Sequence, residues 1–288
     1  MSNNPITPVC WVNGAFRSPQ EAHISAFDHG LLYGDGIFEG IRFYNKKAFL
    51  LEQHLKRLED SAQALCLALP YTRSQWTGII QQVIEAYGAK EGYIRLVVTR
   101  GEGNLGIDPG SCQKASAIVI VDRIHFLSEE KRQRGIETMI TSVQRMSNTA
   151  LDPRIKSLNY LNNVLALMDA KRHGMDEAIM LNPQGYVCEG SGDNIFVAKD
   201  SRLITPPGSD GTLAGITRDF IITLAEQAGI ETEMRSLRPY DLYVADECFL
   251  CGTGAELIPV RAIDGREMQT CPGPLYERIR QAFSQAIQ

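Results

Sequence analysis

The amino-terminal 50 residues constrain the fold most, because they carry the pattern of antiparallel strands. Two short apolar segments, Val9–Val12 and Ala15-Phe16, flank Asn13-Gly14, a dipeptide that favours a tight hairpin turn. The next segment, Tyr33-Gly34-Asp35-Gly36-Ile37-Phe38-Glu39-Gly40-Ile41-Arg42, interrupts strand-forming residues with glycines. Glycines in a strand let the chain bend or let another group approach the backbone closely. The chain therefore begins with a sheet whose central segment is suited to close contacts.

An amphipathic helix is expected after these strands. Its apolar stripe runs from Leu51 to Leu69 at spacings of three and four residues. His54, Arg57 and Ser61 share a neighbouring face of the same helix. The pattern then predicts a second helix over Ser74–Tyr87 and strands over Tyr93–Arg100 and Ala115–Val121.

The segment Gly101-Glu102-Gly103-Asn104-Leu105-Gly106 formally matches a dinucleotide-binding motif, but we reject that interpretation. The motif requires a helix to begin within it. Here Asp108-Pro109-Gly110 follows, and this sequence predicts a turn. The segment is expected to be a glycine-rich loop that lines a pocket.

The length of 288 residues favours two domains. Residues 122–134 are rich in charged side chains without a clear period, which indicates an interdomain connection. We expect the first domain to span residues 1–121 and the second to span residues 135–288. The second domain would begin with a strand over Ile136–Val143.

The second domain contains a lysine in a setting that favours Schiff-base chemistry. Pro153 disfavours helix in the residue before it, so we expect a helix to begin near Lys156. Apolar neighbours, Ile155 and Leu158, would desolvate the ammonium and ease the loss of its proton, as a Schiff-base amine requires. A solvated lysine at a helix start is the alternative for this residue taken alone. The expected helix continues with Leu161, Val164, Leu165 and Met168 at helical spacing.

A carboxylate and two glycine-rich turns follow. Glu189 lies in an otherwise apolar strand, so it either occupies an exposed strand face or needs a buried cationic partner. The first turn, Gly211–Arg218, opens a helix, and the second, Gly252–Glu256, follows a strand. The N–H groups at the helix start would make a seat for a phosphate, and the second turn can also offer N–H groups to an anion. The residues at that helix start are Gly215, Ile216 and Thr217.

Composition and charge exclude several classes of function. The net charge of -5 gives no basic footprint for nucleic acid or for a membrane surface. Met1–Pro8 lacks the apolar core of a signal peptide, and no apolar run is long enough to cross a membrane, so we expect a soluble, cytoplasmic protein. Seven cysteines, an odd number, do not indicate a disulfide framework. Cys248 and Cys251 lack a second pair and a nearby histidine, so we expect no metal site.

Together these features match the requirements of pyridoxal 5'-phosphate. This cofactor needs a lysine amine for its aldehyde carbon and a carboxylate that keeps its ring nitrogen protonated. Its phosphate needs N–H groups, hydroxyls and an arginine. Lys156, Glu189, Arg57 and the two turns could supply them.

The chain resembles the fold-type IV pyridoxal phosphate enzymes, and within them the branched-chain amino acid aminotransferases. The resemblance runs from Val12 to about Val260, and its most specific motifs are Tyr33–Arg42, Lys156–Tyr160 and Glu189–Asn194. It implies an α+β fold like that of D-amino acid aminotransferase, with a small α/β domain, a larger pseudo-barrel domain and the site between them. It also implies a homodimer or higher homo-oligomer in which loops of each subunit close the other's pocket.

The same resemblance implies a role for each matching residue. Lys156 would be the catalytic Schiff-base lysine and proton carrier, Glu189 the partner of the ring nitrogen, and Tyr160 the partner of the ring hydroxyl. The phosphate would be bound by Arg57, Gly215, Ile216, Thr217 and Thr253. The substrate would be bound by Tyr33, Phe38, Arg42, Tyr93, Arg95, Thr253 and Gly254. Among these, Tyr93, Arg95 and the Thr253-Gly254 turn would contact the substrate carboxylate.

The implied activity is ping-pong transamination between an L-branched-chain amino acid (leucine, isoleucine or valine) and a 2-oxo acid such as 2-oxoglutarate, as in branched-chain amino acid biosynthesis. Two residues depart from the family pattern, Gly254 in place of a common alanine and Leu96 in place of a frequent proline. D-amino acid aminotransferase, (R)-amine transaminase and aminodeoxychorismate lyase are alternatives on the same fold. A cofactor-free binding protein is an alternative of another class. Phe38–Arg42 and Tyr93–Arg95 favour the L-branched-chain enzyme.

Overall fold

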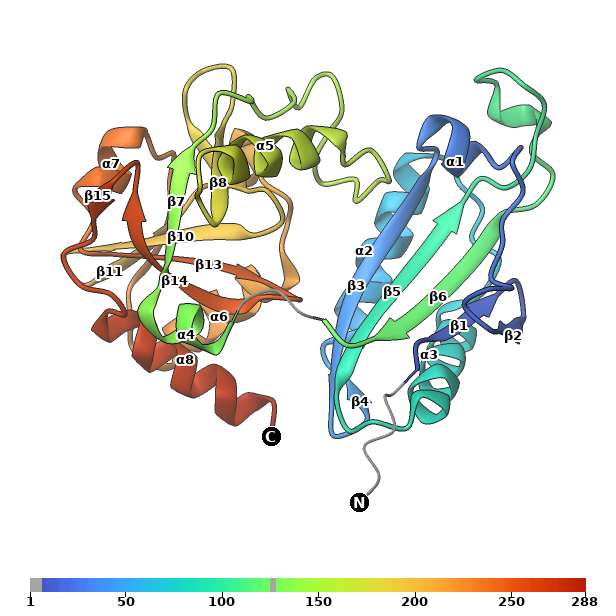
Figure 1. Ribbon diagram of the computed structural model, residues 1–288, viewed down its shortest axis with the longest axis horizontal. Coiled ribbons are helices and arrows are strands. Elements are labelled where there is room, and N and C mark those ends of the chain that lie inside the picture. The colour runs from blue at the N-terminus through green and yellow to red at the C-terminus, as the bar shows by residue number, and fades with distance from the viewer. Residues whose placement is uncertain (1–6, 125–127) are drawn as a thin grey trace. The chain divides into compact units, whose positions relative to one another are not determined.

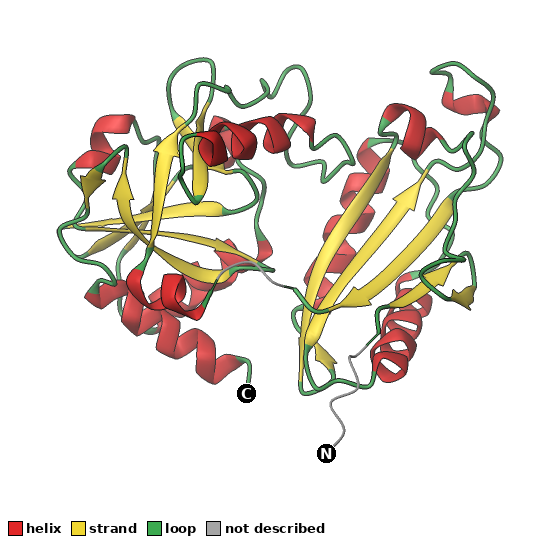
Figure 2. Cartoon of the chain, in the orientation of Figure 1, coloured by secondary structure: helices red, strands yellow, loops and turns green. Residues whose placement is uncertain are grey.

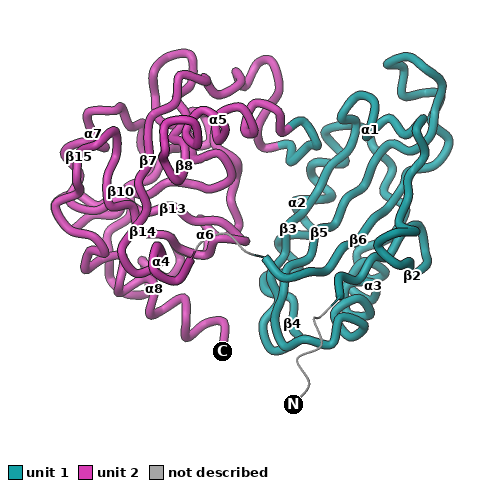
Figure 3. Tube along the Cα trace, in the orientation of Figure 1, with its two compact units in different colours: residues 1–124, 155–159 teal, residues 125–154, 160–288 magenta. Residues whose placement is uncertain are grey.

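A computed structural model describes residues 7–124 and 128–288 of the chain, which form two compact units (Figures 1 and 3). Unit 1 contains the described residues through Ile124 together with Ile155–Asn159. Unit 2 contains the described residues from Ser128 to Arg154 and Tyr160–Gln288. The domain boundaries expected from the sequence remain a prediction, but the assignment of Ile155–Asn159 to unit 1 was not anticipated.

Unit 1 is built on an antiparallel sheet whose described strands follow the order β2-β1-β6-β5-β3-β4 (Figure 2). The strands are β1 Val9–Val12, β2 Ala15–Arg17, β3 Gly36–Tyr44, β4 Lys47–Ala48, β5 Gly92–Thr99 and β6 Ser116–Asp122. The helices are α1 His29–Tyr33, α2 Leu51–Ala64 and α3 Arg73–Tyr87, with a 3-10 turn, η1, at Pro109–Ser111. The predicted hairpin at Asn13-Gly14 is confirmed, and both turn residues have positive φ, 48° and 98°.

The core of unit 1 lies between one face of the sheet and the helices α2 and α3. Alternate residues of β3, β5 and β6 point to this face, where they meet Leu55 and Leu58 of α2 and Trp76 and Ile80 of α3. The predicted apolar stripe of α2 is confirmed at its start, but the helix ends at Ala64 and not at Leu69. Cys66 has a φ of 49°, and this left-handed conformation ends the helix.

The prediction that a helix begins near Lys156 was wrong. Helix α5 spans Leu161–Arg172, and the residues before it pair with the edge of β3. Ser157 forms a β-bridge with Ile37, and Phe38 donates its N–H to the carbonyl of Lys156 at 3.0 Å. These main-chain bonds require an extended backbone, so helix formation is delayed until Leu161.

Unit 2 is built on a larger mixed sheet. Its described strands follow the order β12-β11-β10-β13-β14-β7-β8-β9, and β15 pairs with β14. The pairs β14·β7, β7·β8 and β11·β12 are parallel, and the others are antiparallel. The combination of this sheet with the small antiparallel sheet confirms the predicted α+β fold class.

The elements of unit 2 follow one another along the chain with short connections. The strands are β7 Ile136–Ile140, β8 Glu177–Leu181, β9 Val187–Gly190, β10 Asn194–Lys199, β11 Arg202–Thr205, β12 Thr232–Met234, β13 Glu247–Gly252, β14 Glu256–Ile263 and β15 Arg266–Glu267. The helices are α4 Glu129–Arg134, α5, α6 Ile216–Gln227, α7 Pro239–Tyr243 and α8 Pro274–Ala286, with a 3-10 turn, η2, at Gly208–Asp210. Part of the expected connection, residues 125–127, lies outside the described residues, and its last residues form α4.

Helix α5 presents its apolar side chains outward. Leu161, Val164, Leu165 and Met168 are 69%, 48%, 45% and 43% exposed, whereas Asn163, Ala166 and Ala170 are buried. The helical spacing of the four apolar residues was predicted correctly, but unit 2 buries the opposite side of the helix.

In the described residues, no helix combines the length and the apolar character that crossing a membrane would require. The predicted absence of helix in Gly101–Gly106 is confirmed, since this segment forms a loop.

Candidate active site

Lys156 lies half-buried in unit 1, beside β3 and α2. Its N–H is donated to Ser61 Oγ on α2 at 3.2 Å. Its Nζ lies 4.5 Å from the centroid of the Phe38 ring. An ammonium over an aromatic face is attracted by the electron density of the ring. The backbone pairing and this ring together fix where the amine is presented.

Helix α2 carries His54, Arg57 and Ser61 on one face, as predicted from their spacing, and this face meets Glu39 of β3. Arg57 Nε donates to Glu39 Oε1 and Arg57 Nη2 donates to Glu39 Oε2, each at 2.8 Å. His54 Nδ1 lies 2.7 Å from Glu39 Oε2. Because an ionised carboxylate only accepts hydrogen bonds, His54 donates the proton on Nδ1.

The charges of this cluster follow from its burial. Glu39 is completely buried. Burial alone would raise its pKa, but the Arg57 charge and the hydrogen bonds from Arg57 and His54 outweigh it and hold the pKa at about 2. Burial lowers the pKa of His54, and the bond to Glu39 opposes this only in part. Glu39 is therefore ionised and His54 is neutral at pH 7, so the net charge of the cluster is close to zero.

The expected substrate residues Phe38, Arg42, Tyr93 and Arg95 lie on the face of the sheet that α2 and α3 leave uncovered. Arg95 pairs in register with Gly40, and Arg42 pairs with Tyr93. Arg95 Nη2 donates to the Tyr93 hydroxyl at 3.2 Å, and its guanidinium carbon lies 4.5 Å from the Phe38 ring centroid. A Cβ at Gly40 would lie only 1.9 Å from the Tyr93 hydroxyl, so this glycine makes the close approach that the sequence pattern predicted.

The structure places Tyr33 apart from this group, at the end of α1. Its hydroxyl accepts the N–H of Gly106 at 2.8 Å, and its ring meets the His29 ring edge to face at 4.9 Å between centroids. Tyr33 thus connects α1 with the glycine-rich loop. Its expected role in substrate binding stays a prediction.

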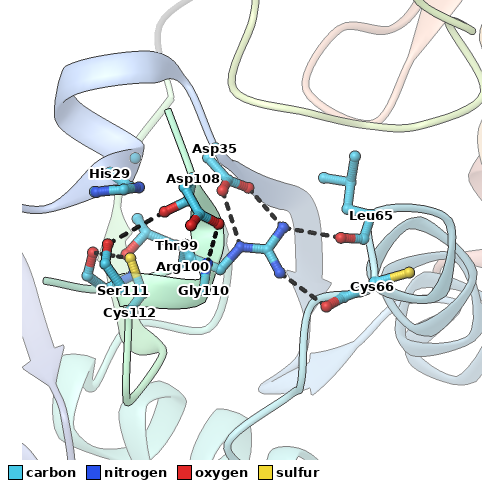
Figure 4. A network of polar contacts seen from close by, with 12 residues as sticks. His29, Asp35, Leu65, Cys66, Thr99, Arg100, Asp108, Gly110, Ser111 and Cys112 are labelled. Carbon is cyan, nitrogen blue, oxygen red and sulfur yellow. Dashed lines mark hydrogen bonds and ion pairs between the residues drawn. The ribbon is translucent and has the colours of Figure 1, made fainter. Parts of the chain in front are cut away.

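A second arginine fixes the strand ends and the carboxyl end of α2 (Figure 4). Arg100 Nε and Nη2 donate to the two oxygens of Asp35, each at 2.9 Å. Arg100 also donates to the carbonyls of Leu65 and Cys66, both at 2.8 Å, just beyond the last residue of α2. The aspartate of the Tyr33–Arg42 motif is therefore structural, and it acts through Arg100 on the helix that carries Arg57.

In unit 2, Glu189 is buried at the end of β9 and receives hydrogen bonds on both oxygens. Leu213 donates its N–H to Oε2 at 2.9 Å, and Asn194 Nδ2 lies 3.3 Å from the same oxygen. Arg145 Nη2 lies 2.8 Å from Oε1 in an ion pair whose side chains are 8% and 7% exposed. Of the two alternatives open for Glu189, the structure selects burial with a cationic partner.

Arg145 was missed by the sequence interpretation. It lies in the connection between β7 and α5, where no periodicity or motif distinguishes it from other arginines. The available signal was indirect, because a carboxylate in an apolar strand demands a cation from elsewhere in the chain.

The two predicted anion-binding turns meet in unit 2. Thr217 Oγ1, in the first turn of α6, lies 3.5 Å from Thr253 Oγ1 in the turn between β13 and β14, which also contains Gly254. Gly215 is the N-cap of α6 and offers no side chain to cap the first N–H groups, those of Ile216 and Thr217 among them. A Cβ at Gly215 would lie 1.8 Å from Asn194 Oδ1, so glycine is required there.

The residues of unit 2 fit one elongated ligand. Leu213, which binds Glu189, is followed along the chain by Gly215 and the start of α6, so a carboxylate and an anion seat are held by one loop. A phosphate suits the hydroxyls and N–H groups of a helix start, and a protonated ring nitrogen suits the carboxylate. The donor set therefore fits pyridoxal phosphate. Tyr160, expected near the ring hydroxyl, is the N-cap residue of α5.

Comparisons with known proteins agree with this donor set. The family described as Amino-transferase class IV matches residues 36–263. The putative branched-chain-amino-acid aminotransferase of Methanocaldococcus jannaschii is 44% identical over 274 residues, which cover 95% of this chain and 94% of that protein. The crystal structure of the Escherichia coli branched-chain amino acid aminotransferase superposes with a TM-score of 0.94 at 34% identity, covering 97% and 94% of the two chains. A thermophile (T.th.) branched-chain amino acid aminotransferase with pyridoxamine 5'-phosphate gives a TM-score of 0.92 at 35% identity, covering 97% and 93%.

Proposed function

The chain belongs to the class IV amino-transferases, and on that premise we propose that Lys156 and Glu189 carry a pyridoxal phosphate-dependent transamination of branched-chain amino acids. The predicted family is thereby confirmed, and the chain is a branched-chain-amino-acid aminotransferase that uses pyridoxal phosphate. The roles of the individual residues are proposed below.

One observation carries the assignment of the cofactor residues. Glu189, Leu213 and the start of α6 form a continuous binding surface, in which a carboxylate for the ring nitrogen and a seat for the phosphate share one loop. Thr217 and Thr253 would bind the phosphate with their hydroxyls, and the N–H groups at the α6 start would add the helix dipole. Arg57 would contribute the positive charge, and Tyr160 would bind the ring hydroxyl.

Lys156 would hold the cofactor and carry the proton. Bound pyridoxal phosphate supplies an electron sink for the electrons of the substrate's α-carbon. Lys156 Nζ would take the proton from that carbon and return it during the second half-reaction. The Phe38 ring, 4.5 Å from Nζ, supports this role because it restricts the position of the amine.

The uncovered face of the unit 1 sheet would bind the amino acid. Arg95 and Tyr93 would bind the substrate carboxylate, since a guanidinium and a phenol present suitable donors. Phe38 and Val97 lie opposite each other on the neighbouring strands β3 and β5 and would contact an apolar side chain. This combination favours leucine, isoleucine and valine over polar substrates. Tyr33, Arg42 and the Thr253-Gly254 turn would complete the substrate site.

The amino acceptor would be a 2-oxo acid such as 2-oxoglutarate. The solved structures of the same T.th. enzyme include a complex with N-(5'-phosphopyridoxyl)-L-glutamate and another with 4-methylvaleric acid. The first joins the cofactor to the amino form of 2-oxoglutarate, and the second resembles the carbon skeleton of leucine. By similarity, we propose the same two substrate classes for this chain.

We also propose that the chain forms a homodimer or higher homo-oligomer. The exposed apolar side chains of α5, together with Leu105 (76% exposed) and Ile107 (84% exposed) in the glycine-rich loop, support a contact with a second copy. Light scattering behind size exclusion tests this proposal. A wild-type monomer at micromolar concentration would contradict it, and Leu165→Glu is expected to weaken the assembly.

The seven cysteines are free thiols. A reducing compartment maintains that state, and a cytoplasmic location belongs to the same proposal.

Initial rates with L-leucine, D-alanine and (R)-1-phenylethylamine, each with 2-oxoglutarate, test the substrate assignment. L-leucine should be preferred by at least about a hundredfold, since a transition-state mismatch of a few kcal/mol has this effect. Lys156→Ala should bind pyridoxal phosphate but lose turnover and borohydride labelling. An active Lys156→Ala variant would contradict the proposal.

A further inference from the structure

We propose that Arg145 is a positioning residue that keeps Glu189 in its carboxylate form and aims it at the cofactor's ring nitrogen. The inference rests on the proposed function of Glu189 and adds to it a residue that acts only through that glutamate.

Arg145 has the contacts of a fixed cation. Its Nη2 lies 2.8 Å from Glu189 Oε1, its Nη1 donates to Asn163 Oδ1 at 2.9 Å, and its Nε donates to the Gly211 carbonyl at 3.3 Å. Each guanidinium nitrogen therefore has an acceptor. Asn163 is itself held by donating Nδ2 to the Ser191 carbonyl at 2.7 Å. The guanidinium cannot rotate away from Glu189 without breaking several buried bonds.

The charge of Arg145 has a chemical consequence for Glu189. A buried carboxyl group without a cation favours its neutral, protonated form. Arginine stays protonated in proteins, so it favours the carboxylate without competing for the proton. Only the carboxylate can accept a hydrogen bond from a protonated ring nitrogen and stabilise its charge. Arg145 would thus determine whether Glu189 can perform its proposed role.

The geometry also divides the two oxygens of Glu189 between their neighbours. Oε1 faces Arg145, whereas Oε2 receives the Leu213 N–H and the Asn194 amide. Bonds from both sides restrict the rotation of the carboxylate plane. Lysine could replace the charge but could not bind Glu189, Asn163 and Gly211 at the same time, because it presents one nitrogen.

The test compares two cofactors that differ only at the ring nitrogen. Apo protein is titrated with pyridoxal 5'-phosphate and with 1-deazapyridoxal 5'-phosphate, in which a C–H replaces that nitrogen, and Kd is measured from the change in absorbance. Arg145→Met should weaken binding of pyridoxal phosphate by about ten- to a hundredfold, the effect of losing a charge-assisted bond. It should change binding of the deaza compound by less than about twofold, and Arg145→Lys should retain part of the preference.

Matched variants distinguish this role from a general loss of structure. Arg278→Met removes an arginine that donates to a carbonyl, that of Ala228, without a carboxylate partner, and should leave both Kd values unchanged. Should Arg145→Met not fold, Arg145→Met/Glu189→Gln removes both charges and avoids an unpaired buried charge. This double variant should match Glu189→Gln alone in its ratio of the two Kd values, because Arg145 acts through Glu189.

Equal weakening of both cofactors by Arg145→Met, or a double variant whose loss is the sum of separate effects, would overturn the inference. Wild-type protein that binds both cofactors equally would instead refute the proposed role of Glu189. The two failures are therefore distinguishable.

Discussion

Glu39 and Arg57 are joined by two parallel hydrogen bonds of 2.8 Å across the contact between β3 and α2. Because a guanidinium is planar, two bonds to one carboxylate fix its orientation as well as its position. Glu39 is completely buried, and its second neighbour, His54, is neutral. The geometry makes Glu39 a support for the arginine that we propose to bind the cofactor's phosphate.

Glu39→Gln should therefore weaken binding of pyridoxal 5'-phosphate about tenfold, because Arg57 would lose its fixed orientation. Binding of pyridoxal, which lacks the phosphate, should remain within about twofold of wild type. Both Kd values are measured by titration of the apo protein. Glu59→Gln is the matched control, since Glu59 lies on the same helix as Arg57 and also pairs with an arginine, but at a more exposed position. Equal effects of Glu39→Gln on both ligands would show that Glu39 does not act on the phosphate.

The acid sensitivity of the fold should depend on the same carboxylate. The pKa of Glu39 is about 2 in the folded protein, against an ordinary value of 4.5. A lowered pKa stabilises the fold fully above pH 4.5, and this contribution is lost as the pH falls toward 2. It is on the order of 3 kcal/mol for a shift of this size.

Urea unfolding of the apo protein between about pH 6 and pH 2 measures this contribution. Wild type should lose on the order of 3 kcal/mol more unfolding free energy over that range than Glu39→Gln, which has no titrating group at the position. Parallel pH curves for the two proteins would show that Glu39 is not held ionised.

Gly40 offers a test of the proposed substrate site. Alanine at this position would place a Cβ 1.9 Å from the Tyr93 hydroxyl, and the phenol must move to avoid it. The sheet can remain intact, because the atom displaced is the end of a side chain. Gly40→Ala should raise KM for L-leucine about tenfold or more while leaving the Kd for pyridoxal phosphate unchanged.

Gly78→Ala is the matched control for this experiment. Gly78 lies in α3, where an added Cβ meets no atom within 4 Å, so the substitution should stabilise the helix slightly and leave KM unchanged. An unaltered KM in Gly40→Ala would remove Tyr93 from the proposed carboxylate site.

The contrast between α2 and Lys156 shows which parts of the fold the sequence could predict. The stripe of α2 and the hairpin at Asn13-Gly14 depend on residues close together in sequence, and both were predicted correctly. The conformation at Lys156 depends on pairing with Ile37 and Phe38, which lie far earlier in the chain. Local patterns contain no information on such a pairing, so a helix was predicted where an extended segment forms.

The candidate site shows the same division. The positions of Glu189, Thr217 and Lys156 could be proposed because each lies in a recognisable motif. Arg145 could not, because its role exists only through a contact with a distant strand. The apolar spacing of α5 likewise indicated a helix but not which of its faces unit 2 would bury.

Arg100 provides the last prediction, which concerns stability. Its guanidinium binds both oxygens of Asp35 and the carbonyls of Leu65 and Cys66, and the Arg100 side chain is only 12% exposed (Figure 4). Arg100→Met would leave Asp35 and two carbonyls without this donor, so the free energy of unfolding should fall by about 1–3 kcal/mol. Urea unfolding measures the change. Arg73→Met, which breaks a more exposed pair with Glu59, should cost at most about 1 kcal/mol. Asp35→Asn/Arg100→Met should recover part of the loss, because the carboxylate left by the single variant is then neutral; a double variant less stable than Arg100→Met would contradict the assigned ion pair.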